Sequence, residues 1–511
     1  MSAPLTLVWF KRDLRVVDHP PLARALEQGG PVVGVYLWEP EALNNRDFDP
    51  RHARFVAQSL DDLRLALHPF GVPLLEVESE ALGFFEKARS VWSEYRIFSH
   101  QEVGNAWSFR RDVRLKGWFR EHSLEWTEWP EPGWERGLKH RDGWDERWGQ
   151  GMRQPLSTLA QKASESSREW AQRWEGGTDR PESARGTAPE FQQGGTAQAQ
   201  AQLDHFFQNA VGAYRAHLSK PLESRDSCSR LSPYLAWGNL SLRQAFQRGL
   251  SELEYGRNKA GIRAWASRLH WQSHFVQKFE SESRMEFEDL NRGFSSLGHV
   301  HRSDHFEAFV RGQTGFPLVD AGVRCLTATG YVNFRMRAML VSFATHWLRL
   351  PWQSIAPVMA RWFLDYLPGI HYPQLQMQSG TTGINALRVY NPIKQAFDHD
   401  PEARFVRHWV PDLAHLPPGL ALQPWNLLPM EELFYGFRKG VDYPDPIVDF
   451  RSGIEFSAMW HAERKSPGVL EENRRILARH TTRDRSIVQR SQTVLKGSIP
   501  TNLEDPEAVL F

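Results

Sequence analysis

Charged residues set into apolar surroundings mark the stretch of this chain that could do chemistry, from Gly312 to Leu413. Arg337 and Asp365 both lie there, among aromatic and aliphatic residues at helical spacing. A buried charge is costly unless it is paired or holds a polar ligand. Two interpretations follow: a structural ion pair in a large helical core, or a charged pair beside a bound polar molecule.

A second polar group lies at Ser229, Arg230, Leu231 and Ser232, just before an apolar helical segment. Hydroxyls and backbone N–H groups at the start of a helix form an anion site, because the first turn has unpaired donors. The same residues are also typical of an ordinary helix cap. The motif alone therefore leaves both interpretations open.

Length and composition limit the class of protein. A chain of 511 residues can form two or three domains. Its 62 basic and 61 acidic residues give a net charge of +1, so any nucleic-acid surface must be a local basic patch. Only two cysteines are present, and neither a signal peptide nor a long apolar run is found. We expect a cytoplasmic monomer with no membrane segment.

The elements that must position these residues divide the chain in two. Four apolar runs of strand length alternate with helical stretches such as 52–67 and 107–121; the runs are Leu5–Phe10, Pro31–Trp38, Val72–Val77 and Tyr95–Ser99. This alternation predicts a doubly wound parallel sheet with helices on both faces. No Gly-rich phosphate loop follows the first strand, so an NAD or ATP site is not expected.

Composition predicts four segments along the chain. Residues 1–130 form the α/β domain, and residues 131–202 form a linker rich in Gly, Ser, Thr, Gln and Ala towards its end. Residues 203–480 form a helical domain, and residues 481–511 form a polar tail. Arginines near the end of the chain are either a solvated surface or a basic arm for nucleic acid. The twenty histidines show no spacing typical of metal ligands, so we expect no metal.

The order of these blocks resembles the photolyase/cryptochrome family. The resemblance runs from Leu5 to about Leu413 and includes the opening segment Trp9–Arg15, the motif at 227–241 and the blocks between 312 and 413. It implies an FAD in the helical domain. It also allows an antenna chromophore, a folate or a deazaflavin, near Glu102–Trp107 in the first domain. The acidic residue expected just before Arg110 is missing, and a packed surface helix is the alternative.

The resemblance assigns the FAD site residue by residue. Ser229, Arg230, Leu231 and Ser232 match the family's diphosphate clamp, with Tyr214 upstream and Trp265 in the pocket wall. Arg337 and Asp365 match the pair beside the isoalloxazine ring, where they would stabilise a reduced flavin by local charge. Leu367 stands where the family usually repeats an aspartate, which makes the site less acidic.

Two positions depart from the family's photochemical pattern. His371 falls at the position that faces flavin N5, where it would either titrate near neutrality and deliver a proton or remain a neutral core histidine. Trp352 matches the middle member of the family's electron-transfer chain, whereas the proximal position is Leu375 and the distal one lies near His299. Other aromatic residues nearby could form a detour: Trp347, Trp362, Tyr366 and Tyr372.

The pocket that binds damaged DNA in the family is only partly matched. Trp271 is retained and could stack on a flipped base, but Arg268 replaces the family's acid. Phe334 and Ala338 replace the histidines of (6-4) photolyases, and Met377 replaces a second tryptophan. The candidates for phosphate contacts are Arg335, Arg388 and Lys394. The sequence thus favours light-driven repair of pyrimidine lesions in DNA, with a blue-light photoreceptor as the alternative.

Overall fold

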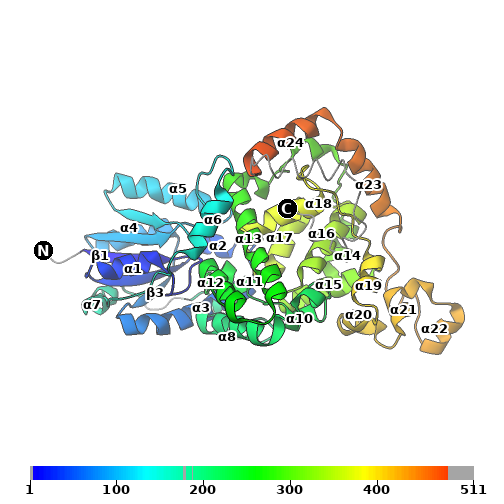
Figure 1. Cartoon of the computed structure of the whole chain (residues 1–511), viewed down its shortest axis with the longest axis horizontal. Helices are drawn as coiled ribbons and strands as arrows, with labels where there is room; N and C mark the ends of the chain where they lie inside the picture. The colour runs from blue at the N-terminus through cyan, green and yellow to red at the C-terminus, as the bar shows by residue number, and fades with distance from the viewer. Residues whose placement is uncertain (1–3, 177–179, 187, 482–511) are drawn as a thin grey trace.

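A computed structural model describes residues 4–176, 180–186 and 188–481. An α/β domain and a larger helical domain lie side by side along the long axis of the molecule (Figure 1). This arrangement confirms the predicted fold class. Among the described residues, no helix is both long and apolar enough to cross a membrane.

The first domain is built on a parallel sheet in the order β3-β2-β1-β4-β5. Its strands are β1 (Leu5–Phe10), β2 (Val32–Trp38), β3 (Leu74–Glu78), β4 (Tyr95–His100) and β5 (Trp126–Trp129). Four of them match the apolar runs of the sequence. The edge strand β5 was missed because all four of its residues are only half-buried, so it lacks the continuous apolar run of a central strand.

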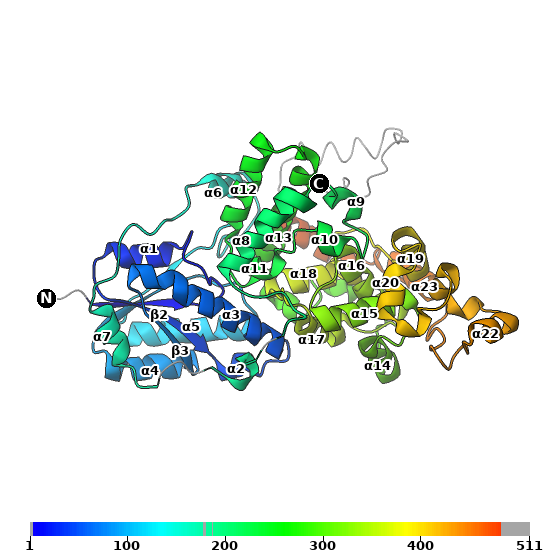
Figure 2. The ribbon, with the colours of Figure 1, turned by 90° about the horizontal axis from the view of Figure 1, so that it is seen from below.

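Alternate side chains of β1 pack against two layers of helices. Val8 and Phe10 pack with α1 (Pro20–Glu27) and α3 (Pro50–Leu67), whereas Leu7 and Trp9 pack with α4 (Ala81–Val91) and α5 (Ala106–Glu121). Successive side chains of a strand point to opposite faces, so one apolar strand serves both layers. Figure 2 shows these helices on the two sides of the sheet.

The connecting segment contains more structure than a bare linker. It holds α6 (Trp144–Arg153) and α7 (Ser167–Gln172), and the Ser167 hydroxyl accepts a hydrogen bond of 3.0 Å from the Val32 N–H. Helix α8 (Thr196–His205) begins before the predicted end of the linker. The linker therefore wraps back onto the sheet instead of hanging free of it.

The second domain is helical throughout. Helix α13 (Lys259–Ser281) packs against α18 (Pro368–Ser379), which also contacts α16 (Phe334–Ser342) and α17 (Trp352–Trp362). The remaining helices are α2 (Pro40–Leu43) in the first domain, and α9 (Tyr214–His217), α10 (Ser224–Ser227), α11 (Ser232–Ala236), α12 (Leu242–Tyr255), α14 (Ser303–Arg311), α15 (Pro317–Thr329), α19 (Pro392–His399), α20 (Arg404–Trp409), α21 (Pro418–Leu422), α22 (Pro429–Tyr435), α23 (Ser452–Glu463) and α24 (Pro467–His480).

The two domains meet where the segment after β1 crosses the segment after α11. The Leu14 N–H donates to the Trp237 carbonyl at 3.3 Å, and the Ser241 hydroxyl donates to the Asp18 carboxylate at 2.6 Å. Gly238 lies between them at φ +71°, and a Cβ there would stand 2.2 Å from the Arg12 carbonyl oxygen. Only glycine permits this close approach of the two backbones.

We expect Gly238→Ala to destabilise the protein by about 3 kcal/mol or more, because the clash is with backbone that cannot rotate away. Gly436→Ala is the matched control, since Gly436 has φ +63° and nothing within 4 Å of an added Cβ. The control should lose only about 1 kcal/mol, the cost of the left-handed conformation. Denaturant unfolding measures both, and equal losses would show that the domain junction tolerates the methyl group.

Candidate functional site

A cavity of about 350 Å³ opens within the helical domain, between α11, α13, α16 and α18. Every residue predicted to bind the cofactor lines it: Tyr214, Ser229, Arg230, Leu231, Ser232, Trp265, Arg337, Asp365, Leu367 and His371. Four of the predicted DNA contacts line the same cavity: Arg268, Trp271, Met377 and Arg388. Residues far apart in the chain therefore converge on one site.

The ion pair in this cavity is bidentate. Arg337 donates from Nη1 to Asp365 Oδ1 at 3.0 Å and from Nη2 to Oδ2 at 2.8 Å. Burial alone would raise the pKa of Asp365, but the charge and hydrogen bonds of Arg337 outweigh it and hold that pKa below its ordinary value. The Arg337 guanidinium also lies 4.2 Å from the centre of the Phe363 ring. The pair thus fixes a charged, oriented wall next to apolar surface.

The loop before α11 is shaped to hold an anion. Arg230 has φ +53°, a conformation that costs energy for a residue with a side chain and often marks a functional site. Its Nη2 donates to the Gln192 side chain at 2.9 Å, and its Nε is buried without a hydrogen-bond partner. A buried guanidinium with an unused donor beside Ser229 and Ser232 suits a phosphate.

His371 has the environment of a neutral core histidine, which is one of the two interpretations that the sequence left open. Its Nε2–H donates to the Ala356 carbonyl at 2.9 Å, which places the proton on that nitrogen. Burial lowers the pKa of His371 to about 4, because the charged ring would lose its hydration. The residue lines the cavity as predicted, but as a neutral imidazole at pH 7.

Two tyrosines link the buried Trp352 to the cavity wall. Trp352 does not line the cavity itself; its ring lies 6.5 Å from Tyr372, centre to centre. Tyr372 lies 5.2 Å from His371, which in turn lies 5.2 Å from Tyr366 in the wall. The Tyr366 hydroxyl donates to Asp47 of the other domain. Of the four aromatic residues proposed for a detour, Tyr366 and Tyr372 have ring contacts that lead from Trp352 through His371 to the cavity wall.

The other two aromatic residues lie elsewhere. Trp347 packs against Phe316 and Phe343, and its indole N–H donates to the Tyr390 carbonyl at 2.9 Å. Trp362 packs against Phe309. Among the described residues, neither tryptophan has a ring contact with Tyr366, Tyr372 or His371.

Two of the predicted phosphate contacts lie outside the cavity. Arg335 hydrogen-bonds the Ser219 hydroxyl at 3.3 Å, and Lys394 is exposed and pairs with Asp398 at 3.1 Å. Their role at a DNA surface stays a prediction. Several polar lining residues were missed, among them Asn333, Gln374 and Gln272, although Gln272 lies four residues after Arg268 and shares its face of α13. The i, i+4 spacing was the available signal.

The α/β domain contributes two further cavities at the carboxyl ends of its strands, where parallel sheets usually bind ligands. One of about 120 Å³ is lined by Trp38, Glu39, Asn105, Trp107 and Arg111. Arg111 already binds Glu39 at 2.6 Å and Glu102 at 2.7 Å, so the acidic groups of this region are occupied. An antenna chromophore here stays a prediction.

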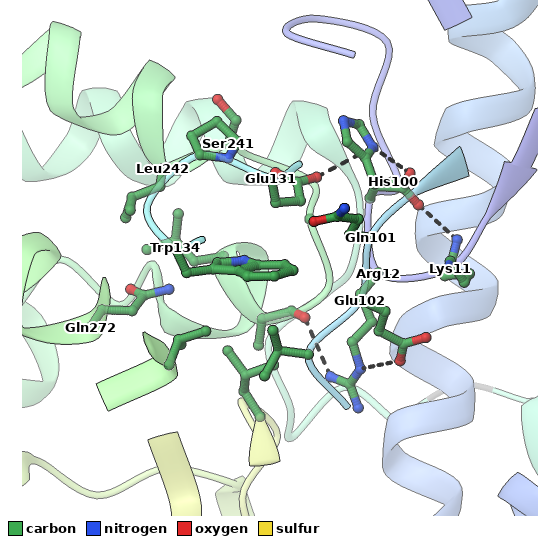
Figure 3. Close-up of a pocket in the computed structure, with 18 of the residues that line it drawn as sticks. Lys11, Arg12, His100, Gln101, Glu102, Glu131, Trp134, Ser241, Leu242 and Gln272 are labelled. Atoms are coloured by element: carbon green, nitrogen blue, oxygen red, sulfur yellow. Dashed lines mark hydrogen bonds and ion pairs between the residues drawn. The ribbon is translucent and has the colours of Figure 1, made fainter. Parts of the chain in front are cut away.

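The other cavity, of about 100 Å³, lies between the domains (Figure 3). Trp134, Gln101 and Gln272 line it, together with His100, whose Nε2 is buried without a partner. It shares Leu235, Ala236, Gln272 and Leu367 with the cavity of the helical domain. These four residues therefore belong to the walls of both cavities.

A cluster beside this cavity contains the residue types that bind metals. Its hydrogen bonds, however, place a proton on one of the candidate ligand nitrogens. Asp13, His19 and His100 bring their ligand atoms within 4.8 Å of one another. However, His19 Nδ1 accepts the Leu22 N–H at 3.1 Å, so its proton must lie on Nε2, which donates to Asp13 at 3.0 Å. A protonated nitrogen cannot bind a metal. In this arrangement His19 donates to Asp13 and does not offer Nε2 as a ligand.

Comparison with known proteins identifies the family. A family model described as "DNA photolyase" matches residues 6–131, and one described as "FAD binding domain of DNA photolyase" matches residues 265–459. Cryptochrome DASH from Gloeobacter violaceus is 29% identical over 506 residues, covering 92% of this chain and 99% of that protein. Deoxyribodipyrimidine photo-lyase from Vibrio cholerae is 26% identical over 484 residues, covering 88% and 98%.

Solved structures show the same fold. A Synechocystis cryptochrome has a TM-score of 0.79 at 24% identity, covering 90% of this chain and 99% of that one. A bacterial class III photolyase from Agrobacterium tumefaciens has a TM-score of 0.77 at 23% identity, covering 91% and 98%. The fold and cavity are those of a flavoprotein that binds FAD. The chain belongs to the photolyase/cryptochrome family, as its sequence predicted, and its function is FAD-dependent.

The buried His371 gives a testable dependence on pH. Its folded pKa of about 4 lies below the ordinary value of 6.5, so the unfolded chain binds its proton more tightly. The contribution of His371 to stability is therefore complete above pH 6.5 and is lost as the pH falls towards 4. Between pH 7 and pH 5 the parent protein should lose about 2 kcal/mol more unfolding free energy than His371→Asn. Denaturant titrations at the two pH values measure the difference, and equal losses would mean that His371 is protonated in the fold.

Proposed function

We propose that this protein uses FAD bound in the helical-domain cavity to repair pyrimidine lesions in DNA with light. The observation that carries the proposal is that Trp271 and Arg268 line the same cavity as Arg230, Arg337 and Asp365. A flipped base held by the first group would thus lie beside a cofactor held by the second. Relatives named deoxyribodipyrimidine photo-lyase, such as the Vibrio cholerae protein, support this reading.

Each residue has a role that follows from its geometry. Arg230, Ser229 and Ser232 would bind the FAD diphosphate, and the oriented pair of Arg337 and Asp365 would lie beside its ring. Bound FAD supplies light absorption and electron transfer. Trp271 would stack on the lesion, while Arg268 would hydrogen-bond a pyrimidine carbonyl or a phosphate. His371 would act as a neutral polar group, because its Nε2–H is already held by the Ala356 carbonyl.

A blue-light photoreceptor is the second candidate, and one observation favours it. Arg268 lines the cavity where the family's acid was expected, and an arginine cannot accept a hydrogen bond as a carboxylate does. A receptor needs no such carboxylate, since it acts on no lesion. DNA binding therefore separates the two functions.

We further propose a reducing cellular compartment, because Cys228 and Cys325 are free and buried.

Removing the ion pair should release the cofactor. Arg337→Ala leaves Asp365 buried without its partner, and Asp365→Ala does the same to Arg337, at a cost of about 3 kcal/mol or more. We expect each variant to be purified with most of its FAD lost, measured as flavin released per protein on denaturation. Arg335→Ala, which changes a neighbouring arginine outside the cavity, should keep its FAD. Full occupancy in both pair variants would place the FAD elsewhere.

Trp271 tests the repair proposal directly. We expect Trp271→Ala to weaken binding to DNA that contains a pyrimidine dimer by about 1–3 kcal/mol, the contribution of one base stack. Binding to undamaged duplex should hardly change, since it depends on phosphate contacts and falls with salt. Trp170→Ala, a half-buried tryptophan of α7, is the control. A parent protein that binds damaged and undamaged DNA equally would favour the photoreceptor.

A further inference from the structure

A buried arginine outside the cavity of the helical domain has no ion-pair partner among the described residues. Arg141 has 2% of its surface exposed, and its guanidinium lies 4.5 Å from the centre of the Trp144 ring. Within the described residues its side chain makes one hydrogen bond, from Nη2 to the His274 carbonyl at 2.9 Å, while Nε and Nη1 have no partner. Within the described part of the chain, no carboxylate lies at ion-pair distance from it. A buried charge in this state is costly unless something else compensates it.

A second buried cation accompanies it. Lys278 of α13 has 4% of its surface exposed, and across the described ranges its ammonium has neither an ion pair nor a hydrogen bond to another side chain. Burial, helped by the charge of Arg141, lowers the pKa of Lys278 to about 8, although Glu282 opposes the shift. The two cations therefore repel each other in a region of low polarity.

A groove of about 450 Å³ lies near these cations, between the loop after β5 and α24, although neither Arg141 nor Lys278 lines it. We call it the α24 groove; it is lined by Gly137, Leu138, Lys139, His140, Glu280, Ser281, Arg475, Ala478 and Arg479. Arg141 follows its wall residue His140 in the chain, and Lys278 lies one helical turn before Ser281. Helix α24 covers this edge of the helical domain (Figure 1).

Most carboxylates around the groove already have partners. Glu282 binds Arg284 at 2.6 Å, Arg475 at 2.8 Å and His480 at 2.8 Å. Glu280 lies 3.5 Å from Arg136, but its Oε2 is buried without a hydrogen-bond partner, and burial raises its pKa. The lining itself carries Lys139, Arg475 and Arg479 against the one carboxylate of Glu280, which leaves a surplus of positive charge.

The rim of the groove offers hydrogen-bond donors for an anion. Arg479 donates from Nη2 to the Ser281 carbonyl, and its Nε is buried without a partner. Lys139 is exposed at the edge. The Ser281 hydroxyl accepts a bond from Gln277 at 3.3 Å, which leaves its own proton free to donate. These are the groups that bind phosphate oxygens in proteins.

We propose that the α24 groove binds a small metabolite through a doubly charged phosphate group. A dianion would offset the surplus of the lining cations Lys139, Arg475 and Arg479, whereas a DNA phosphodiester brings only one charge at each position. The groove is separate from the flavin cavity, because Arg268, Gln272 and Phe275 of α13 line that cavity while Ser281 lines the groove. Binding here would act on the end of α24 and is independent of the proposed repair function.

Thermal unfolding of the full FAD-loaded protein tests the proposal, with inorganic phosphate as the probe and chloride at equal ionic strength as the reference. We expect phosphate to raise the midpoint saturably. The double variant Lys139→Gln, Arg479→Gln should lower the apparent phosphate affinity about tenfold or more, and Arg479→Lys should keep most of it. Arg474→Gln is the control, because Arg474 lies on the same helix, is exposed and pairs with Glu471.

The single variant Lys139→Gln is a second test that should leave folding intact. The described structure shows no hydrogen bond or ion pair of this exposed side chain. This variant should lower phosphate affinity several-fold while the midpoint in chloride stays unchanged. Identical midpoints in phosphate and chloride for the parent protein would overturn the proposal. So would loss of undamaged-duplex binding in the double variant without any phosphate effect, which would make the groove a contact for the DNA backbone.

Discussion

The bidentate ion pair of Arg337 and Asp365 is the constraint on which the helical domain depends. It joins α16 to the turn before α18, with Arg337 partly open to the cavity and Asp365 almost fully buried. Neither charge would be tolerated alone among Phe363, Tyr331 and their apolar neighbours. Helix α16 and the turn before α18 are therefore held together, which also fixes the positions of Leu367 and His371 in the cavity wall.

Helix α13 contributes residues to two separate sites. Its face with Arg268, Gln272 and Phe275 lines the cavity of the helical domain, and its far end carries Ser281 to the α24 groove. The α/β domain reaches the same region from the other side through Asp47, which binds Tyr366. Because Tyr366 lines both the flavin cavity and the cavity of the α/β domain, the two domains share a wall and are not simply tethered.

The sequence alone predicted much of this, for physical reasons that differ from place to place. Four strands were predicted from apolar runs, and the family motifs predicted cofactor-binding residues that line one cavity in the structure. The strand β5 escaped because its four residues are half-buried at a sheet edge. The pKa of His371 could not be read from the sequence, since it depends on burial by residues from several helices. The pairing of Trp352 with Tyr372, and the uncompensated Arg141 and Lys278, likewise depend on distances that spacing does not give.

The most direct test of the account is repair itself. The FAD-loaded protein, reduced and kept free of oxygen, is illuminated with DNA that carries one cyclobutane pyrimidine dimer, and the restored pyrimidines are counted against a dark sample. We expect restoration that needs light and is strongly diminished in Trp271→Ala. A fully FAD-loaded protein that restores neither this dimer nor another pyrimidine lesion in the light would contradict it and leave the photoreceptor as the function.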